Sequence, residues 1–481
     1  QATSMNLCFP MALRSLFLLC LAGHSTAWLL GGFAPAPRSA VQRAASASMA
    51  AKAVNVAIVG GGTVGGGIVE ILSGKATFLR DQLGVEAKIS KICVRDASRQ
   101  RDFAVPDGCK IVTDVNEILD DAAVEMVVEV MGGTDLAKTV VTKALKAGKH
   151  VVTANKALIA QDLPELKALI ASVNEGRETP VSFGYEAAVC GGIPIIHALQ
   201  RDFLGDEVTQ LSGIINGCTN FMLSNMAKGG LSYSASLAEA SELGYAEADP
   251  TLDVGGFDAR SKLRILIKLA FGLDVIEDEI PVRGITEVTA TDFDYAKSLD
   301  GTIKLLGVAK LDRPKGKLSA FVSPCFVKDS NTLAAIDGAT NAIQVDSASL
   351  QQSILVGQGA GRFPTANSCV SDILDILQGT GAKQPFPKVN SDLKFVNTFN
   401  SAFYIRIRFR DGVGIISDLG DVFKDGGVSI YSILQNPIGN PEDAVFVVVT
   451  DPVDVSSVKK VCASLEATDW CLGDIFYMPV L

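Results

Sequence analysis

Residues 244–262, which read GYAEADPTLDVGGFDARSK, concentrate side chains that can hold a cation or move a proton. Four carboxylates and a closing lysine fall within this stretch, namely Glu247, Asp249, Asp253, Asp258 and Lys262. The chain of 481 residues has only three histidines, so we expect proton chemistry to fall to lysine and carboxylate groups. A solvated surface loop is the alternative that these residue types leave open.

Helical spacing places the lysine beside one of these carboxylates. Asp258 and Lys262 are four positions apart in an amphipathic helix that we expect to begin near Phe257, so they share one face. Leu266 and Leu269 continue nearly the same face, which directs the lysine along the apolar stripe. A half-buried lysine is paired with an acid or has a lowered pKa, and either condition suits proton donation. The alternative is a structural helix ion pair worth only about 0.3–0.5 kcal/mol.

An earlier glycine-rich turn indicates a dinucleotide. Residues 53–59 form an apolar run typical of a buried parallel strand, and GGGTVGGGIVEIL follows directly. The glycines that satisfy G-x-G-x-x-G are Gly60, Gly62 and Gly65. They permit a tight turn, close approach of a pyrophosphate and packing of helix on strand. Thr63 and Val64 open the predicted helix, whose free N–H groups would face the phosphates.

The next predicted strand, residues 87–94, bears on which dinucleotide binds. Arg95 and Asp96 follow it directly, with Arg99 close behind. An acid here usually holds the ribose 2′-hydroxyl of NAD, whereas an arginine accommodates the 2′-phosphate of NADP. We favour NADPH, with NADH as the alternative. A solvated loop capped by Arg95 and Asp96 is the third interpretation.

Alternating strand and helix patterns predict an α/β fold with a doubly wound sheet, a Rossmann domain over residues 52–182. Lys156, in TANK, follows one of these strands at the carboxyl edge where such sheets bind ligands, although a surface lysine at a helix start would look the same. We expect an α+β substrate-binding and dimerisation domain over 183–380, whose last helix returns to the first domain. After a linker at 381–398, residues 399–481 predict a ferredoxin-like βαββαβ unit.

Charge and the first residues bear on partners and location. A net charge of −10 gives no reason to expect binding to nucleic acid or to an anionic membrane by the mature chain. Residues 1–51 hold no acid, with a short apolar run followed by a segment rich in Ser, Ala and Pro. This resembles the signal-plus-transit presequences of algae with complex plastids, beginning at Met5 or Met11. Ordinary secretion is the alternative.

The acidic stretch also resembles the signature of homoserine dehydrogenases. TANKA, NGCTNFML and GQGAGRFPTANSCVSDI are similar to further motifs of that family, in the expected order. The resemblance covers roughly residues 53–380, with Cys218 in place of an expected threonine. Such enzymes reduce L-aspartate 4-semialdehyde to L-homoserine with NAD(P)H, on the branch to threonine, methionine and isoleucine.

The resemblance implies roles for the candidate residues. Glu247 and Asp258 would bind the amino-acid end of the substrate, with Asp253 behind them. Lys262 would donate the proton to the carbonyl oxygen, and Lys156 would lie beside the nicotinamide and the substrate. The backbones that would approach the cofactor are those of Gly244 and Gly359.

The same resemblance implies a monovalent cation, expected to be Na⁺, near the domain hinge. An oxygen-only site suits such a hard cation. The implied ligands are the carboxylate of Glu186 and backbone carbonyls of Val189, Gly191 and Ile193.

The tail DGVGIISDLGDVFKDGGVSIYSILQ resembles an ACT domain, an amino-acid-sensing module. We expect threonine as effector, bound near Asp411, Gly414 and Ile416, in a homodimer or larger homo-oligomer. Val413 stands where the family commonly has proline. A dimerisation module without a ligand is the alternative.

Overall fold

The computed structural model of this chain describes residues 52–246, 248–381 and 384–481. The predicted presequence and Glu247 lie outside the described residues. Within the described ranges, no helix is long and apolar enough to cross a membrane.

The first half of the chain builds a six-stranded sheet in which every neighbouring pair is parallel. Its strands, in pairing order, are β3 (Lys110–Val112), β2 (Val85–Cys93), β1 (Lys52–Val59), β4 (Met126–Glu129), β5 (His150–Thr153) and β6 (Phe183–Gly184). The order 3-2-1-4-5-6 is that of a Rossmann fold, which confirms the predicted doubly wound sheet. β6 lies just beyond residue 182, where the predicted Rossmann domain ends. The prediction missed this strand because two residues give no periodic signal.

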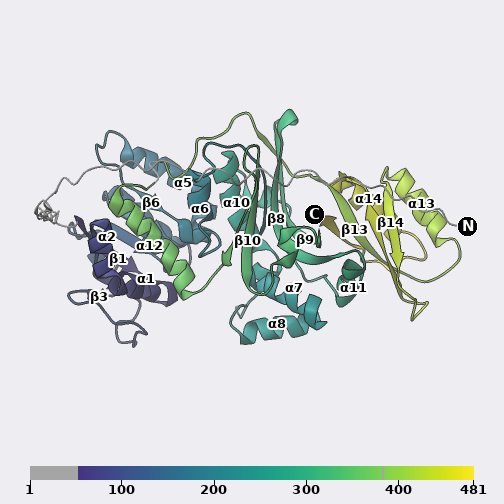
Figure 1. Cartoon of the computed structure of the whole chain (residues 1–481), viewed down its shortest axis with the longest axis horizontal. Coiled ribbons are helices and arrows are strands. Elements are labelled where there is room, and N and C mark those ends of the chain that lie inside the picture. The colour runs from purple at the N-terminus through teal and green to yellow at the C-terminus, as the bar shows by residue number, and fades with distance from the viewer. Residues whose placement is uncertain (1–51, 247, 382–383) are drawn as a thin grey trace, which may run out of the picture. The chain divides into compact units, whose positions relative to one another are not determined.

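Helices cover both faces of this sheet, which explains why β4 is buried at all four positions. Those connecting its strands are α1 (Thr63–Gly74), α2 (Ala76–Leu83), α3 (Asn116–Leu119), α4 (Asp135–Lys146) and α5 (Lys156–Asn174). A helix from much later in the chain, α12 (Arg362–Gln378), packs against α1 (Figure 1). Arg362 pairs there with Glu70 at 3.1 Å, although the two are 292 positions apart.

The middle of the chain adds antiparallel strands and the helices that carry the acidic stretch. The strands are β7 (Val208–Ile214), β8 (Gly301–Asp312), β9 (Lys317–Lys328), β10 (Thr340–Ser347) and β11 (Gln351–Gln358). The helices are α6 (Ile195–Arg201), α7 (Gly217–Gly229), α8 (Tyr233–Glu242), α9 (Thr251–Val254), α10 (Phe257–Phe271) and α11 (Ala290–Ser298). α10 begins where predicted, after Gly256, whose φ of +81° favours glycine. It packs against both α5 and β8.

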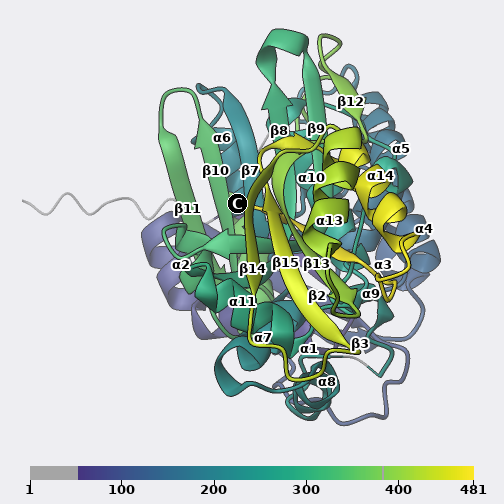
Figure 2. The ribbon, with the colours of Figure 1, turned by 90° about the vertical axis from the view of Figure 1, so that its right-hand side faces the viewer.

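The tail follows the order strand, helix, strand, strand, helix, strand. Its main elements are β13 (Asn400–Phe409), α13 (Ile415–Asp425), β14 (Ile430–Gln435), β15 (Ala444–Thr450), α14 (Val455–Glu466) and β17 (Phe476–Val480), with the short β16 (Val453–Asp454) before α14. Both helices lie on one face of the strands and share a buried apolar core with them (Figure 2).

The tail strands do not form a separate sheet. β17 pairs with β9 through Val480 and Phe326, and β12 (Lys394–Val396) also pairs with β9. One sheet of eleven strands therefore runs through the middle of the chain and the tail.

Candidate active site

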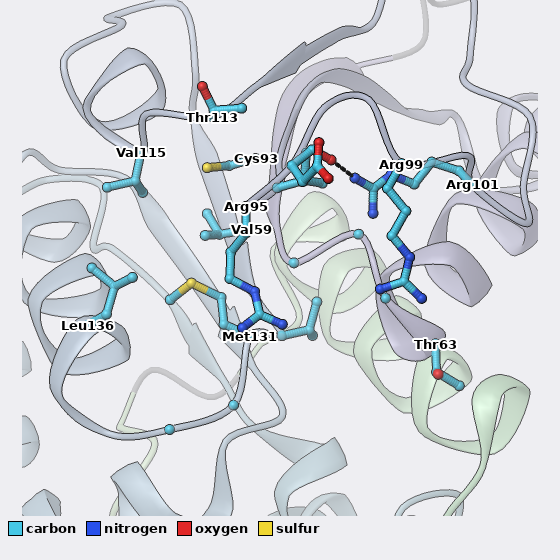
Figure 3. A pocket seen from close by; sticks show the side chains of 18 of the residues that line it. Val59, Thr63, Cys93, Arg95, Arg99, Arg101, Thr113, Val115, Met131 and Leu136 are labelled. Carbon is cyan, nitrogen blue, oxygen red and sulfur yellow. Dashed lines mark hydrogen bonds between the residues drawn. The ribbon is translucent and has the colours of Figure 1, made fainter.

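A cavity of about 1260 Å³ lies at the carboxyl ends of β1 to β4, against the glycine turn (Figure 3). Gly60 has φ of +120°, and a Cβ on Gly65 would lie 1.9 Å from the Gly60 carbonyl oxygen. A Cβ on Gly62 would meet nothing within 4 Å, so that glycine leaves room for a ligand. Tight turn, open approach and close helix packing are the three features that a dinucleotide pyrophosphate needs.

The predicted cofactor residues divide between the cavity wall and its support. Those lining the cavity are Gly60, Gly62, Thr63 and Arg95. Val64 and the buried Gly65 lie behind them in the first turn of α1, where N–H groups lack partners within the helix. Gly244, with φ of +75° after α8, and Gly359, after β11, do not line this cavity.

The loop after β2 brings both cations and an acid to the cavity, because Arg95, Arg99 and Asp96 all line it. Arg95 and Arg99 both line it and extend side chains into it (Figure 3). The carboxylate of Asp96 instead accepts hydrogen bonds from its own turn, from the N–H of Ser98 at 2.8 Å and its hydroxyl at 2.6 Å. The acid at this strand end is thus held within its own turn.

Lys262 and Asp258 form an ion pair within α10, as the helix ion-pair alternative expected, but both side chains are buried, unlike those of a weak surface pair. Asp258 is 6% exposed and Lys262 8%. Lys262 Nζ lies 2.8 Å from Asp258 Oδ2 and donates to the carbonyl oxygen of Ile215 at 2.8 Å. The ammonium is therefore fixed from two sides.

A second lysine reaches the same carboxylate from the Rossmann domain. Lys156, the first residue of α5, makes an ion pair with Asp258 Oδ1. Each oxygen of Asp258 thus faces a different ammonium. The Lys156 side chain is 44% exposed, so this side of the pair is open to solvent.

Mutual pairing decides the protonation of both partners. Burial alone would raise the pKa of Asp258, but Lys262 and Lys156 outweigh it and hold that pKa well below its ordinary value. Burial would lower the pKa of Lys262, but Asp258 outweighs it and raises that pKa. Of the two conditions the sequence left open, pairing with an acid is the one found, and Lys262 carries its proton at neutral pH.

Asn216 completes this group, which we call the Asp258 cluster: Asp258, Lys262, Lys156 and Asn216. Its amide nitrogen donates to Asp258 Oδ2 at 2.8 Å and to Asp253 Oδ1 at 2.7 Å, while its amide oxygen caps α7. Burial raises the pKa of Asp253, partly offset by this bond. Sequence reasoning used NGCTNFML only as a motif of the family and did not single out this side chain. An asparagine directly before a helical pattern was the available signal.

Not every acid of the stretch joins the cluster. The carboxylate of Asp249 accepts from the N–H of Thr251 at 3.1 Å and from its hydroxyl at 2.6 Å, within an exposed turn. Glu247 lies outside the described residues. Among the described acids of the stretch, Asp258 therefore contacts both lysines, and Asp253 is linked to it through Asn216.

Several of the predicted cation ligands already accept hydrogen bonds from other groups of the chain. Glu186 accepts from the N–H groups of Ile196 at 3.0 Å and His197 at 2.6 Å, so its carboxylate caps α6. The carbonyl of Gly191 accepts from the Ser368 hydroxyl at 2.7 Å. Burial raises the pKa of Glu186 to about 7, with the ring of His197 opposing the shift. These contacts engage the Glu186 carboxylate and one lone pair of the Gly191 carbonyl, and the carbonyl of Ile193 accepts from the Ile195 N–H at 2.8 Å. We derive no step through a cation.

The predicted effector residues lie on the surface of the tail. Gly414, with φ of +98°, caps the start of α13, and the Asp411 N–H donates to the Pro441 carbonyl at 2.7 Å. Ile416, in the first turn, is 53% exposed. The three residues share one end of α13.

Comparison with known proteins places this geometry in a family. The model of the homoserine dehydrogenase NAD binding domain matches residues 60–179, and that of homoserine dehydrogenase matches residues 194–374. The chain is similar to homoserine dehydrogenase of Bacillus subtilis, with 38% identity over 83% of this chain and 92% of that protein. The protein of the same name from Neisseria gonorrhoeae is 35% identical over 87% of this chain and 96% of its own length.

Solved structures agree with these matches. A homoserine dehydrogenase from Thiobacillus denitrificans superimposes with a TM-score of 0.82 and 32% identity, covering 89% of this chain and 98% of that one. The matches span the dinucleotide cavity, the Asp258 cluster and most of the remaining chain. The chain therefore belongs to the homoserine dehydrogenase family, whose members are NAD(P)-dependent oxidoreductases.

Proposed function

We propose that this enzyme reduces L-aspartate 4-semialdehyde to L-homoserine with NADPH at the Asp258 cluster. The observation that carries the proposal is a buried lysine fixed on a carboxylate that a second, solvent-accessible lysine also contacts. Bound in the cavity beside the glycine turn, the cofactor supplies a hydride to the carbonyl carbon. The residues of the chain have the remaining task of binding the substrate and controlling the carbonyl oxygen.

Lys262 is the group suited to that oxygen. As the C=O bond is reduced, the oxygen becomes an alkoxide, takes a proton from Lys262 Nζ and leaves a neutral amine. An alkoxide is a much stronger base than an amine, so the raised pKa of Lys262 does not oppose this transfer. Before the transfer, the ammonium stabilises the developing negative charge.

Asp258, Asp253 and Lys156 are suited to the charged end of the substrate. A free amino acid brings an ammonium and a carboxylate, which require an acid and a base respectively. The exposed Lys156 can turn from Asp258 to the substrate carboxylate, which leaves Asp258 Oδ1 for the substrate ammonium. The amide nitrogen of Asn216 donates to both Asp253 and Asp258 and so links the two carboxylates.

The direct test follows NADPH absorbance with protein that begins at Lys52. L-Aspartate 4-semialdehyde should be reduced rapidly, whereas butanal, which lacks both charged groups, should react far more slowly. Equal rates with the two aldehydes would contradict the proposed binding role of the cluster. No oxidation by folded protein that binds NADPH would contradict the reaction itself.

The preference for NADPH rests on Arg95 and Arg99 in the cavity and on the engagement of Asp96 with Ser98. A hyperthermophilic archaeal homoserine dehydrogenase mutant, similar at 26% identity with a TM-score of 0.55, was solved in complex with NADPH. The same assay with NADH measures the preference.

Threonine inhibition through the tail remains a proposal, supported by the exposed start of α13 at Asp411, Gly414 and Ile416. The Ile416→Glu substitution, which introduces a charge at the start of α13, should abolish inhibition by added threonine and leave the uninhibited rate unchanged. Inhibition that persists in this variant would place the effector elsewhere or leave the tail as a dimerisation module.

Location, assembly and the cation remain proposals of the same kind. Residues 1–51, fused to a fluorescent protein, should direct it to the plastid of an alga with complex plastids, and export to the medium would favour secretion.

A homodimer or larger homo-oligomer would give at least twice the mass of one chain by light scattering. Replacement of Na⁺ by a bulky organic cation tests the cation.

A further inference from the structure

The helix that carries Lys156 is interrupted at Asp162, before it completes two turns. α5 contains Pro164, which has no N–H group, so the carbonyl of Ala160 lacks its normal partner within the helix. Asp162 has non-helical angles, φ −110° and ψ 18°. The first segment of α5, residues 156–161, is therefore separated from the rest of the helix and needs anchors of its own.

One anchor of this segment is on the Rossmann side. Asn155 caps the helix by accepting from the N–H of Leu158 at 3.1 Å, and its amide donates to the carbonyl of Gly133 at 2.6 Å. These bonds fix the start of the segment to the loop after β4. They do not relate it to α10, where Asp258 and Lys262 lie.

The other anchor comes from α10. Arg264 Nη1 donates to the Ala160 carbonyl, the group that Pro164 leaves without a partner. Its Nε donates to the carbonyl of Val275 at 2.7 Å, and Glu277 Oε2 lies 3.9 Å from Nη1. The guanidinium thus joins two backbone segments with a planar fork that a lysine cannot reproduce.

We infer that Arg264 is a positioning residue that holds the first segment of α5 against α10 and so places Lys156 on Asp258. Polar contacts that join the first segment of α5 to α10 include Lys156 with Asp258 and Ala160 with Arg264. Ala160 lies one helical turn after Lys156, so a shift at the second of these contacts moves the first. The inference rests on the proposed role of Lys156.

The consequence is specific to one of the two lysines. Loss of the guanidinium leaves Lys262 on Asp258, because that pair lies within α10. Lys156, however, is released from its register, and a displacement of about 1 Å near the reacting groups can reduce the rate about 100-fold. The defect should therefore resemble loss of Lys156.

Arg264→Met tests this, with Arg260→Met as a matched control. Arg260 lies one turn earlier on α10 and is similarly covered, at 15% against 14% side-chain exposure. Its ion-pair partners are Glu277 and Asp278, which do not belong to α5. We expect kcat/KM for the semialdehyde to fall about 10- to 100-fold in Arg264→Met, with an unchanged Kd for NADPH. Arg260→Met should stay within about twofold of the parent. Equal losses in both variants would overturn the inference.

A double-mutant cycle separates positioning from general stability. In a Lys156→Met background, Arg264→Met should cost no further activity per folded molecule, because it acts through the missing lysine. If the losses from the two substitutions multiply in the double variant, the inference about Arg264 is wrong, while the proposed role of Lys156 stands. Full activity of Lys156→Met would overturn the proposed role of Lys156 and the inference with it. Should Arg264→Met fail to fold, Arg264→Lys serves in the same cycle, with a smaller loss expected because its ammonium reaches only one of the two carbonyls.

Discussion

Asp258 and Asp292 are buried carboxylates built from similar parts, one beside the dinucleotide domain and one beside the tail. Asp292 accepts from Tyr404 at 3.0 Å and from the N–H and hydroxyl of Thr289 at 2.8 and 2.9 Å, and it pairs with Arg406. We call these four residues the Asp292 cluster. The Asp292 carboxylate is 0% exposed and its partners here all belong to the cluster. By contrast, one carboxylate oxygen of Asp258 contacts Lys156, whose side chain is half-exposed.

The number of cations makes the electrostatic difference. Burial would raise the pKa of either carboxyl group. Two lysines reverse this for Asp258, whereas Arg406 leaves the pKa of Asp292 above its ordinary value. A closed, fully hydrogen-bonded pair is suited to join two parts of a fold. An open pair with a second cation is suited to exchange one partner for a substrate. The contrast predicts loss of activity from damage to one cluster and loss of stability from damage to the other.

The largest expected effect is on catalysis. Lys262→Met should reduce kcat by about 10²- to 10⁴-fold, the usual contribution of a general acid. The Kd for NADPH, measured by fluorescence titration, should remain unchanged because the cavity lies against other residues. Parent-level turnover by this variant would remove the distinction between the two clusters.

Arg406→Met should produce the opposite result. It leaves Asp292 buried without its cation, which should lower the free energy of unfolding by about 3–5 kcal/mol in urea denaturation. Arg408, on the same strand, pairs with Asp443 at 3.0 Å and is 41% exposed, so Arg408→Met should cost less than about 1 kcal/mol. Equal costs for the two arginines would contradict a structural role for the Asp292 cluster.

Asn216→Ala should have a smaller catalytic effect than loss of the lysine. It removes hydrogen bonds to Asp258 and Asp253, each to a charged group, so kcat/KM should fall about 10- to 100-fold. Asn225, on the same helix, bonds to Glu239 at 2.9 Å instead, and Asn225→Ala should leave kcat/KM unchanged. A similar loss in both variants would point to the helix rather than to the cluster.

The pH dependence sharpens the account of the pairing. Because the pKa of Lys262 is raised above 10.5, its ammonium and the stability it contributes persist at lower pH and are lost only as the pH rises through that higher pKa. The lowered pKa of Asp258 keeps its charge down to acidic pH. The kcat/KM for reduction should therefore vary less than about threefold between about pH 6 and pH 9. A fall in kcat/KM with a midpoint near pH 8 would indicate a lowered pKa of Lys262 and would contradict the pairing.

The smallest expected effect concerns the cofactor. Arg95→Ala should reduce kcat/KM for NADPH about tenfold relative to NADH, because it removes one cation from the cavity without touching the Asp258 cluster. Parallel measurements with the two cofactors separate selectivity from general damage. If the ratio of kcat/KM for NADPH to kcat/KM for NADH did not change, either Arg99 alone would set the preference for NADPH or the proposed preference would be wrong.

Local spacing predicted the parts of this comparison that lie on single elements. The interval between Asp258 and Lys262 placed both on one helix face, and the glycine pattern predicted the turn under the cofactor cavity. The contact of Lys156 with Asp258 spans 102 positions and two domains, so no local pattern contains it. Asp249, although in the same acidic stretch, bonds within its own turn.

The tail shows the same limit. Its order of elements followed from periodicity, but its junction with β9 and the pair of Asp292 with Arg406 are tertiary contacts. They also affect experiments, because deletion of residues 399–481 would expose the edge of β9 and leave Asp292 unpaired. Point variants such as Ile416→Glu avoid that damage.

The most direct test of the central claim is chemical rescue of Lys262→Ala by methylamine, followed as single-turnover oxidation of NADPH by L-aspartate 4-semialdehyde. If the Lys262 ammonium supplies the proton, oxidation should be nearly absent without amine and should recover in proportion to added methylammonium. Rapid oxidation without any amine would show that the proton comes from elsewhere and would contradict the account.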